Sequence, residues 1–304
     1  MVNTDAKKAR KIRKKKEVLL LLAPMPALLV GALVMHKSGI PAAIYVQNLI
    51  CYIVLGLILL STHFFTNFFT QRKPFRSLHS PHANPALLGL GCILLALTFA
   101  DPGLEGVHRW VGVGGFRLNM AFVVLPCMIL GLDTQLCSKH SLYALAIVIV
   151  VAALLLLQPD ASQLSAFAMA VMFLLLARVQ SKPVKYIALP LFVCAVILAW
   201  VRLDTLEPVA HVEGILGLAR DIGFAWFAAG LASLTVLLLP FVGLRNASRS
   251  AQALGIYYLT TVLATLFGHF PVPFVGHGVS SVIGYLLAVY ALLRKDVLAQ
   301  QTHR

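Results

Sequence analysis

Near its C-terminal end the chain reads Pro271-Val272-Pro273-Phe274-Val275-Gly276-His277-Gly278-Val279-Ser280-Ser281, between two apolar segments. The two prolines fix φ and lack a backbone donor, while the two glycines reach conformations that other residues avoid. A chain can fold back at membrane depth only where protein or a water-filled cavity shelters its backbone. We therefore predict a rigid re-entrant Pro/Gly turn that forms the wall of a site.

The composition around this turn is that of a membrane protein. Of the 304 residues, 60% are hydrophobic and 12% are charged, and the mean hydropathy is +0.87. A water-soluble domain needs more charge on its surface than this. The fold class is therefore predicted to be all-α, a polytopic integral membrane protein of about ten transmembrane helices. The predicted spans lie near 18–35, 42–65, 85–100, 118–132, 142–157, 164–177, 186–200, 222–242, 252–270 and 280–293.

Basic residues mark alternate loops of this arrangement. Cytoplasmic loops of membrane proteins are enriched in lysine and arginine. If the N-terminus is cytoplasmic, the segments on that side hold 20 of the 25 basic residues, in the N-terminal arm and in 71–84, 133–141, 178–185, 243–251 and 294–304. Both termini are therefore predicted to be cytoplasmic.

Three regions follow from this topology. We predict a basic cytoplasmic arm over 1–17, a single transmembrane helical domain over 18–293 and a short cytoplasmic tail over 294–304. The first span has the basic flank of a signal peptide, but Pro24 and Pro26 interrupt it and no convincing cleavage site follows, so its retention is expected.

Charge, cysteine spacing and histidine spacing argue against a nucleic-acid partner, disulfides and a metal site. The net charge of +14 is explained by topology and attraction to anionic lipid, so no nucleic-acid partner is expected. The five cysteines lie in spans or in an inner loop without a CxxC pair, which predicts neither disulfides nor a metal site. No histidines have the close helical spacing of a zinc ligand set.

Polar residues gather in four outer segments. Seven of the eleven acidic residues fall in outer loops, so carboxylate chemistry is expected on the outer face. The four segments are 106–116, 158–160, 202–213 and the turn 271–281. In the first segment, Arg109 and Trp110 among glycines suit a phosphate headgroup, or alternatively anchor the chain at the membrane boundary.

These segments resemble, in order and spacing, signatures of the SEDS family. The matching motifs are His108-Arg109-Trp110-Val111-Gly112 with Gly115-Phe116, Gln158-Pro159-Asp160 at the start of a span, Ala210-His211-Val212-Glu213-Gly214-Ile215, and Pro273 to Ser281 before the last span. The resemblance covers about residues 40 to 300. It implies a ten-helix protein of the bacterial inner membrane that polymerises peptidoglycan from lipid II, beside a penicillin-binding transpeptidase.

The chain also departs from the family pattern. His277 stands where the family has a tyrosine, and Asn119-Met120-Ala121-Phe122 stands where it has Gln-Pro-Ser-Glu. The large outer loop that carries the family's catalytic aspartate is reduced here to 201–220. The resemblance therefore leaves enzymatic activity open.

Candidate site residues come from the chemistry of glycan extension. The reaction needs a carboxylate base near the acceptor hydroxyl and positive charge near the departing diphosphate. The candidate bases are Asp204, Glu207 and Glu213, of which Glu207 with Pro208 best matches the family's acidic-Pro pair. A divalent cation could accompany a diphosphate substrate. The predicted substrate-binding residues are Arg109, Trp110, Gln158, Asp160, Arg202, His277, Gly278, Ser280 and Ser281.

Three functions remain open on the sequence. The first is a peptidoglycan glycosyltransferase acting on lipid II or another lipid-linked diphosphate sugar. The second is a catalytically degenerate scaffold or binding subunit for a penicillin-binding transpeptidase. The third is a transporter of a lipid-linked precursor, which is disfavoured because ion-coupled transporters bury ionisable residues in their spans and these spans contain almost none.

Overall fold

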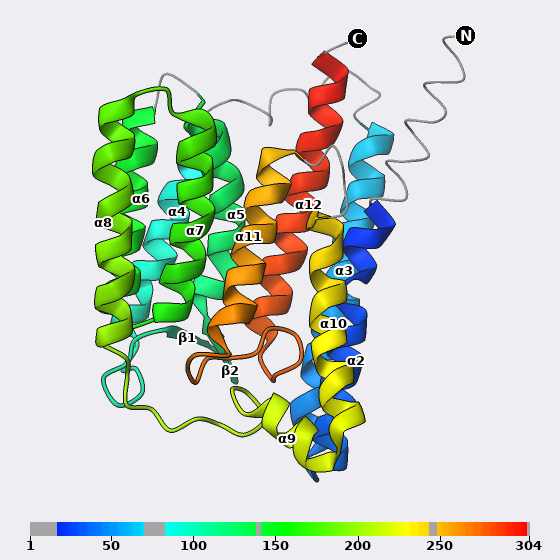
Figure 1. Ribbon diagram of the computed structural model, residues 1–304. Helices are drawn as coiled ribbons and strands as arrows, with labels where there is room; N and C mark the ends of the chain where they lie inside the picture. Colours follow the sequence, from blue (N-terminus) through cyan, green and yellow to red (C-terminus); the bar gives the residue numbers. More distant parts are fainter. Residues whose placement is uncertain (1–16, 70–82, 138–140, 243–247, 303–304) are drawn as a thin grey trace.

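The computed structural model describes residues 17–69, 83–137, 141–242 and 248–302. Long helices run roughly side by side and make up most of this part of the chain (Figure 1). Ten of them correspond to the predicted spans: α2 (Met25–Lys37), α3 (Ala42–Phe69), α4 (Ala83–Leu97), α5 (Met120–Gln135), α6 (Ser141–Leu157), α7 (Ala161–Arg178), α8 (Lys182–Val201), α10 (Phe224–Val242), α11 (Arg249–Ala264) and α12 (Val279–Thr302).

Length and composition of these helices support membrane insertion. Five helical segments are long and apolar enough to cross a membrane: Glu17–Lys37, Ala42–Thr62, Ala161–Arg178, Lys182–Val201 and Phe224–Phe241. Three shorter apolar helices accompany them, at Pro85–Ala100, Met120–Gln135 and Leu142–Leu157. The predicted all-α, polytopic membrane fold is confirmed.

The most buried helices form the centre of the bundle. Helix α7 packs along α11, and α5 packs along α12 and α4. Glycines allow the closest approaches: a Cβ at Gly284 of α12 would lie 1.9 Å from the Phe122 carbonyl oxygen of α5. Helix α8 lies at the edge of the bundle, where most of its apolar side chains are exposed (Figure 1).

Polar side chains fix where three of the helices begin. Asn119 accepts a hydrogen bond from Phe122 N at α5, Asp160 from Gln163 N at α7, and Ser248 from Ala251 N at α11. A side chain that accepts from the free N–H groups of the first turn stabilises a helix start.

Several predicted boundaries were wrong. Residues 118 and 119 belong to a β-hairpin of β1 (Trp110–Val113) and β2 (Phe116–Asn119), not to a span, because Gly114 at φ 60° and Gly115 form a tight turn. Residues 265–270 leave the helix after Ala264, where the last turn is closed by hydrogen bonds from Thr265 N to Val262 O and Leu263 O.

Two further boundaries differ near the ends of the chain. The span expected from 222 begins at Phe224, because Gly223 (φ 151°) separates α10 from the short α9 (Ile215–Ile222). Helix α12 continues to Thr302, so the predicted tail over 294–304 is helical as far as the structure describes it. Of the predicted basic arm over 1–17, residues 1–16 lie outside the described residues.

The hairpin, α9 and the turn between α11 and α12 lie at the same end of the bundle (Figure 1). The C-terminal end of α12 lies at the opposite end. All four polar segments singled out in the sequence are therefore at one end.

Candidate functional site

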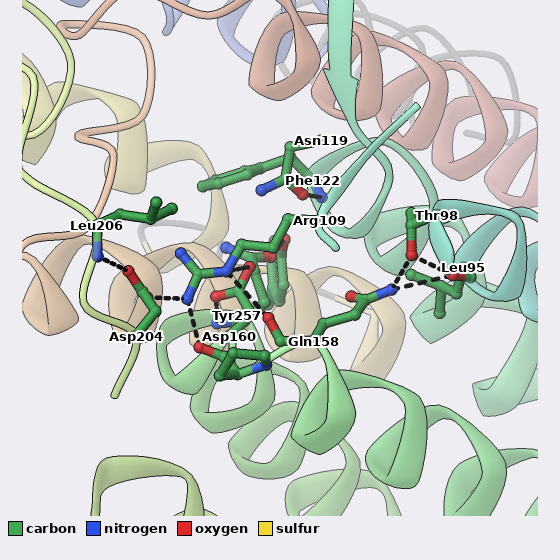
Figure 2. Close-up of polar contacts among 12 residues, drawn as sticks. Leu95, Thr98, Arg109, Asn119, Phe122, Gln158, Asp160, Asp204, Leu206 and Tyr257 are labelled. Carbon is green, nitrogen blue, oxygen red and sulfur yellow. Dashed lines mark hydrogen bonds and ion pairs between the residues drawn. The ribbon is translucent and has the colours of Figure 1, made fainter. Parts of the chain in front are cut away.

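Arg109 is the centre of a buried ionic cluster at this end. Its side chain is only 6% exposed and is held by the corner between α6 and α7. The Nε group donates to the Gln158 carbonyl at 3.3 Å and lies 3.8 Å from Asp160 Oδ2. The Nη2 group donates to the Pro159 carbonyl and to Asp204 Oδ2 (Figure 2). Three segments distant in sequence therefore meet at one guanidinium.

The corner that receives Arg109 is itself fixed by Gln158. Its side chain is fully buried, and Nε2 donates to the Leu95 carbonyl at 3.0 Å and to Thr98 Oγ1 at 2.8 Å (Figure 2). Asp160 caps α7 through Gln163 N, and the Gln163 side chain accepts from the Tyr257 hydroxyl. A buried polar group needs such partners to offset its lost hydration.

The outer loop contributes two carboxylates to this region. Asp204 Oδ1 accepts from Leu206 N at 3.1 Å while Oδ2 meets Arg109. Glu213 is half-buried and its Oε2 accepts from Val209 N at 2.8 Å. Burial raises the pKa of Glu213 despite that hydrogen bond, and the charges of Arg109 and Asp204 also act on it, with opposite signs. Glu213 thus binds a proton more readily than an ordinary glutamate.

The turn 271–278 is held in place by a buried amide that the sequence reasoning did not single out. Asn48 of α3 is 2% exposed, donates from Nδ2 to the Gly276 carbonyl at 2.9 Å and accepts at Oδ1 from Gly278 N at 3.1 Å. Phe274 adopts φ 67°, and its ring packs 5.3 Å from that of Tyr285. The predicted Pro/Gly turn before the last helix is therefore present, anchored from a neighbouring helix on one side and from the core on the other.

The same turn is joined to the outer loop by main-chain hydrogen bonds. Val272 N donates to Val212 O at 3.3 Å, and His277 N donates to His211 O at 2.8 Å. The His211 and His277 rings lie 5.8 Å apart between centroids. Burial lowers the pKa of both imidazoles, and that of His277 is lowered further by His211. The pair therefore favours the neutral form.

The β-hairpin connects the ionic cluster with the turn. Met120 N donates to the Arg109 carbonyl at 3.2 Å, and Asn119 N donates to Ser280 Oγ at 2.9 Å. At the other end of the hairpin, the Asp101 carboxylate accepts from Gly103 N and Gly112 N, and these bonds lower its pKa. Ionic cluster, hairpin, outer loop and turn thus form one continuous structure.

The predicted site residues fall into four groups. Arg109, Gln158, Asp160 and Asp204 form the cluster, with Glu213 nearby, and His277, Gly278, Ser280 and Ser281 belong to the turn and the start of α12. Trp110 is half-buried at the start of β1, opposite Asn119. Arg202 at the end of α8 and Glu207 in the outer loop are exposed, and neither side chain makes a hydrogen bond or ion pair with another described residue.

The chemistry of this site follows from its charges. The Arg109 guanidinium already faces four oxygen acceptors, so it acts here as the partner of Asp160 and Asp204. Exposed Arg202 and Arg117 remain available to an anionic ligand. Within the described ranges, no three His, Cys, Asp or Glu residues are arranged to hold a metal ion.

Several residues of the site had only a weak sequence signal. Asn48 is a polar residue inside an apolar span, which is expensive unless it has a role, and this signal could have identified it. The Gly114-Gly115 pair between two alternating apolar runs is a hairpin signal. Thr98 and Gln163 carried no comparable signal.

Comparisons with known proteins address the fold. No protein-family model and no curated protein sequence matches the chain. Three solved structures are similar over nearly its whole length. The rod shape determining protein RodA of Thermus thermophilus is 19% identical, with a TM-score of 0.61 and coverage of 91% of this chain and 96% of RodA. An aspartate-to-alanine mutant of RodA gives a TM-score of 0.62 at the same identity and coverage.

The third structure is a chain from a report on the structural coordination of polymerization and crosslinking by a peptidoglycan synthase complex. It is 18% identical, with a TM-score of 0.60 and coverage of 91% of this chain and 97% of that one. At this identity the likeness establishes the fold alone. The SEDS-like fold that the motifs predicted is thereby confirmed, and the chain is an integral membrane protein with the fold of RodA.

Proposed function

We propose that this protein works in cell-wall synthesis at the bacterial inner membrane, where it extends a glycan strand from lipid II or a similar lipid-linked diphosphate sugar. The fold shared with RodA supports this role. The observation that carries it is the ionic cluster of Arg109, Asp160 and Asp204, which joins the outer loop to the bundle beside Glu213.

The proposed reaction uses Glu213 as the general base. An acceptor hydroxyl of one lipid-linked sugar attacks the anomeric carbon of another; the new bond joins that oxygen to the carbon, and the bond from the carbon to the diphosphate oxygen breaks. The hydroxyl proton passes to Glu213, whose raised pKa suits a group that takes up a proton. The electron pair of the broken bond leaves with the diphosphate.

Positive charge is also needed as the diphosphate departs. Arg202 and Arg117 are exposed on the outer side and can bond phosphate oxygens bidentately. Arg109 instead holds Asp204, and with it the outer loop, in position. Of the three candidate bases, Glu213 is favoured over Asp204, which is occupied by Arg109, and over Glu207, which is exposed.

A polymerisation assay with purified protein tests this proposal. Full-length protein in detergent or liposomes is given fluorescent lipid II, and glycan products are separated by length. We expect polymer from the wild type and a loss of at least about 100-fold in Glu213→Gln, the usual scale of general-base catalysis. Glu207→Gln is the matched control and should retain activity. Equal activity in Glu213→Gln and Glu207→Gln would remove Glu213 as the base.

A second function is favoured by one observation, the bonding of Arg109 to protein groups. Because its Nε and Nη2 donors already face carboxylates and carbonyls, the cluster can hold the loop without binding a substrate. The protein would then be a scaffold for a penicillin-binding transpeptidase. Wild-type protein that forms no polymer, yet co-purifies with such a transpeptidase and raises its crosslinking rate, would establish the scaffold and reject the glycosyltransferase.

A further inference from the structure

A second ionic cluster lies at the opposite end of the bundle. Asp133, near the end of α5, is 1% exposed. Its Oδ1 accepts from Arg178 Nε at 2.8 Å, and its Oδ2 accepts from Lys295 Nζ at 2.8 Å and from the Ser250 hydroxyl. Helices α5, α7, α11 and α12 are thus tied together at one carboxylate, which neutralises part of the surrounding charge.

Two more cations are held against the last turn of α7. Lys185 Nζ donates to the Leu176 carbonyl at 3.0 Å, and Arg249 Nη1 donates to the Ala177 carbonyl at 2.7 Å. Lys182 begins α8 four residues after Arg178. Arg178, Lys182, Lys185, Arg249 and Lys295 form what we call the α7–α8 basic patch.

This patch has more positive charge than its described surroundings neutralise. Asp133 is the only carboxylate that the described hydrogen bonds bring to these five cations. The first turn of α8 has no acidic residue, and Ser181 does not cap it through its side chain. The positive end of a helix dipole favours anions, yet this turn contains Lys182 and Lys185. The five positive charges of the patch repel one another, so an external anion bound beside them stabilises the arrangement.

The positive-inside bias alone does not explain this arrangement. That bias needs basic residues only somewhere in the cytoplasmic segments. Here Lys185 in the first turns of α8 and Arg249 at the start of α11 both donate to consecutive carbonyls at the end of α7. The convergence of separate segments is a property of the fold.

The neighbours of the patch indicate the source of the anion. Leu176, Tyr186 and Ile187 are 54%, 74% and 71% exposed, so exposed apolar side chains adjoin the cations. Basic pockets between helices at the cytoplasmic boundary bind anionic lipid headgroups. We propose that the α7–α8 basic patch binds the phosphate headgroup of an anionic phospholipid in the adjoining leaflet.

Lipid binding to the purified full-length protein tests the proposal. Binding of phosphatidylglycerol, cardiolipin and phosphatidylcholine is measured in detergent by native mass spectrometry, with thermal stabilisation as a second readout. The variant combines Lys182→Gln, Lys185→Gln and Arg249→Gln and leaves the Asp133 partners intact. The control removes two outer charges that have no role in the proposed reaction, by Lys37→Gln and Arg220→Gln.

We expect the wild type and the control to prefer the two anionic lipids over phosphatidylcholine. Each basic residue near a membrane surface strengthens binding by about fivefold, so the triple variant should lose about 100-fold in affinity for anionic lipid. An equal loss per removed charge in the patch variant and in the control would overturn the proposal, as would equal binding of phosphatidylcholine. Displacement of the lipid by millimolar inorganic phosphate would assign the patch to a soluble anion and overturn it too.

Discussion

At the residue scale, the ion pairs of Arg109 hold the outer loop against the helical bundle. Its guanidinium lies between Asp160 and Asp204, with side-chain exposures of 6%, 4% and 13%. Removing one member of a buried ion pair leaves an uncompensated charge. We expect Arg109→Ala to lower the free energy of unfolding by roughly 3 kcal/mol. Thermal unfolding in detergent would show a reduced Tm.

The control for this prediction is Glu207→Gln, a charge change at an exposed position, which should leave the Tm unchanged. Arg109→Ala combined with Asp204→Asn should recover part of the loss, since one of the stranded charges is then removed. An Arg109→Ala protein as stable as the wild type would show that the cluster does not stabilise the fold.

His211 and His277 give a pH dependence at the same scale. Burial lowers the pKa of both imidazoles, so the unfolded chain takes up protons first as the pH falls. Stability should therefore decrease as the pH falls through about 6.5, the ordinary histidine pKa. Measured by Tm, the decrease between pH 7.5 and 5.5 should be smaller in His277→Gln than in the wild type.

Glu213 acts on stability with the opposite sign, because a raised carboxyl pKa favours the folded state at low pH. The wild type and His277→Gln both contain Glu213, so the difference between their pH profiles of Tm reports the contribution of His277. Identical profiles in wild type and His277→Gln would contradict the assignment.

At the scale of elements, close backbone contacts position the turn. A Cβ at Gly31 of α2 would lie 2.1 Å from the Val275 carbonyl oxygen, whereas a Cβ at Gly56 of α3 would meet nothing within 4 Å. Gly31→Ala should therefore force α2 away from the turn and cost about 1–3 kcal/mol by overpacking. Gly56→Ala should be neutral or slightly stabilising, because alanine favours a helix over glycine.

Thermal unfolding of both glycine variants measures this difference. Equal stability of Gly31→Ala and Gly56→Ala would show that α2 does not fix the turn.

At the scale of the whole molecule, ten helices in the described part of the chain correspond to the ten predicted spans, and an even number of spans predicts that both termini lie on the same side. We predict that this side is the cytoplasm, because it holds 20 of the 25 basic residues. In a cysteine-free background, Ser248→Cys before α11 should resist a membrane-impermeant maleimide added from outside. Thr205→Cys in the outer loop should react with it. The reverse pattern of labelling would invert the topology.

The sequence by itself determined the class of the protein and its helix pattern. An apolar segment must satisfy its backbone within itself when it crosses a bilayer, so composition and periodicity are enough to identify it. The turn at 271–278 was also predictable, since proline and glycine restrict the backbone locally. Gln158, Asp160 and Arg109 could be named as polar residues in otherwise apolar surroundings.

Only the tertiary structure decided which polar groups meet. Arg109 contacts Asp204 across 95 positions of sequence, and Asn48 bonds Gly276 across 228. In the structure Glu207 is exposed and Glu213 is half-buried, although the family motif favoured Glu207 as the base. Likewise, the sequence placed Lys185 and Arg249 in two separate basic loops, whereas in the structure both donate to carbonyls at the end of α7. Backbone propensity and hydropathy act over a few residues, whereas the pairing of charges depends on how whole helices pack, and no local pattern encodes it.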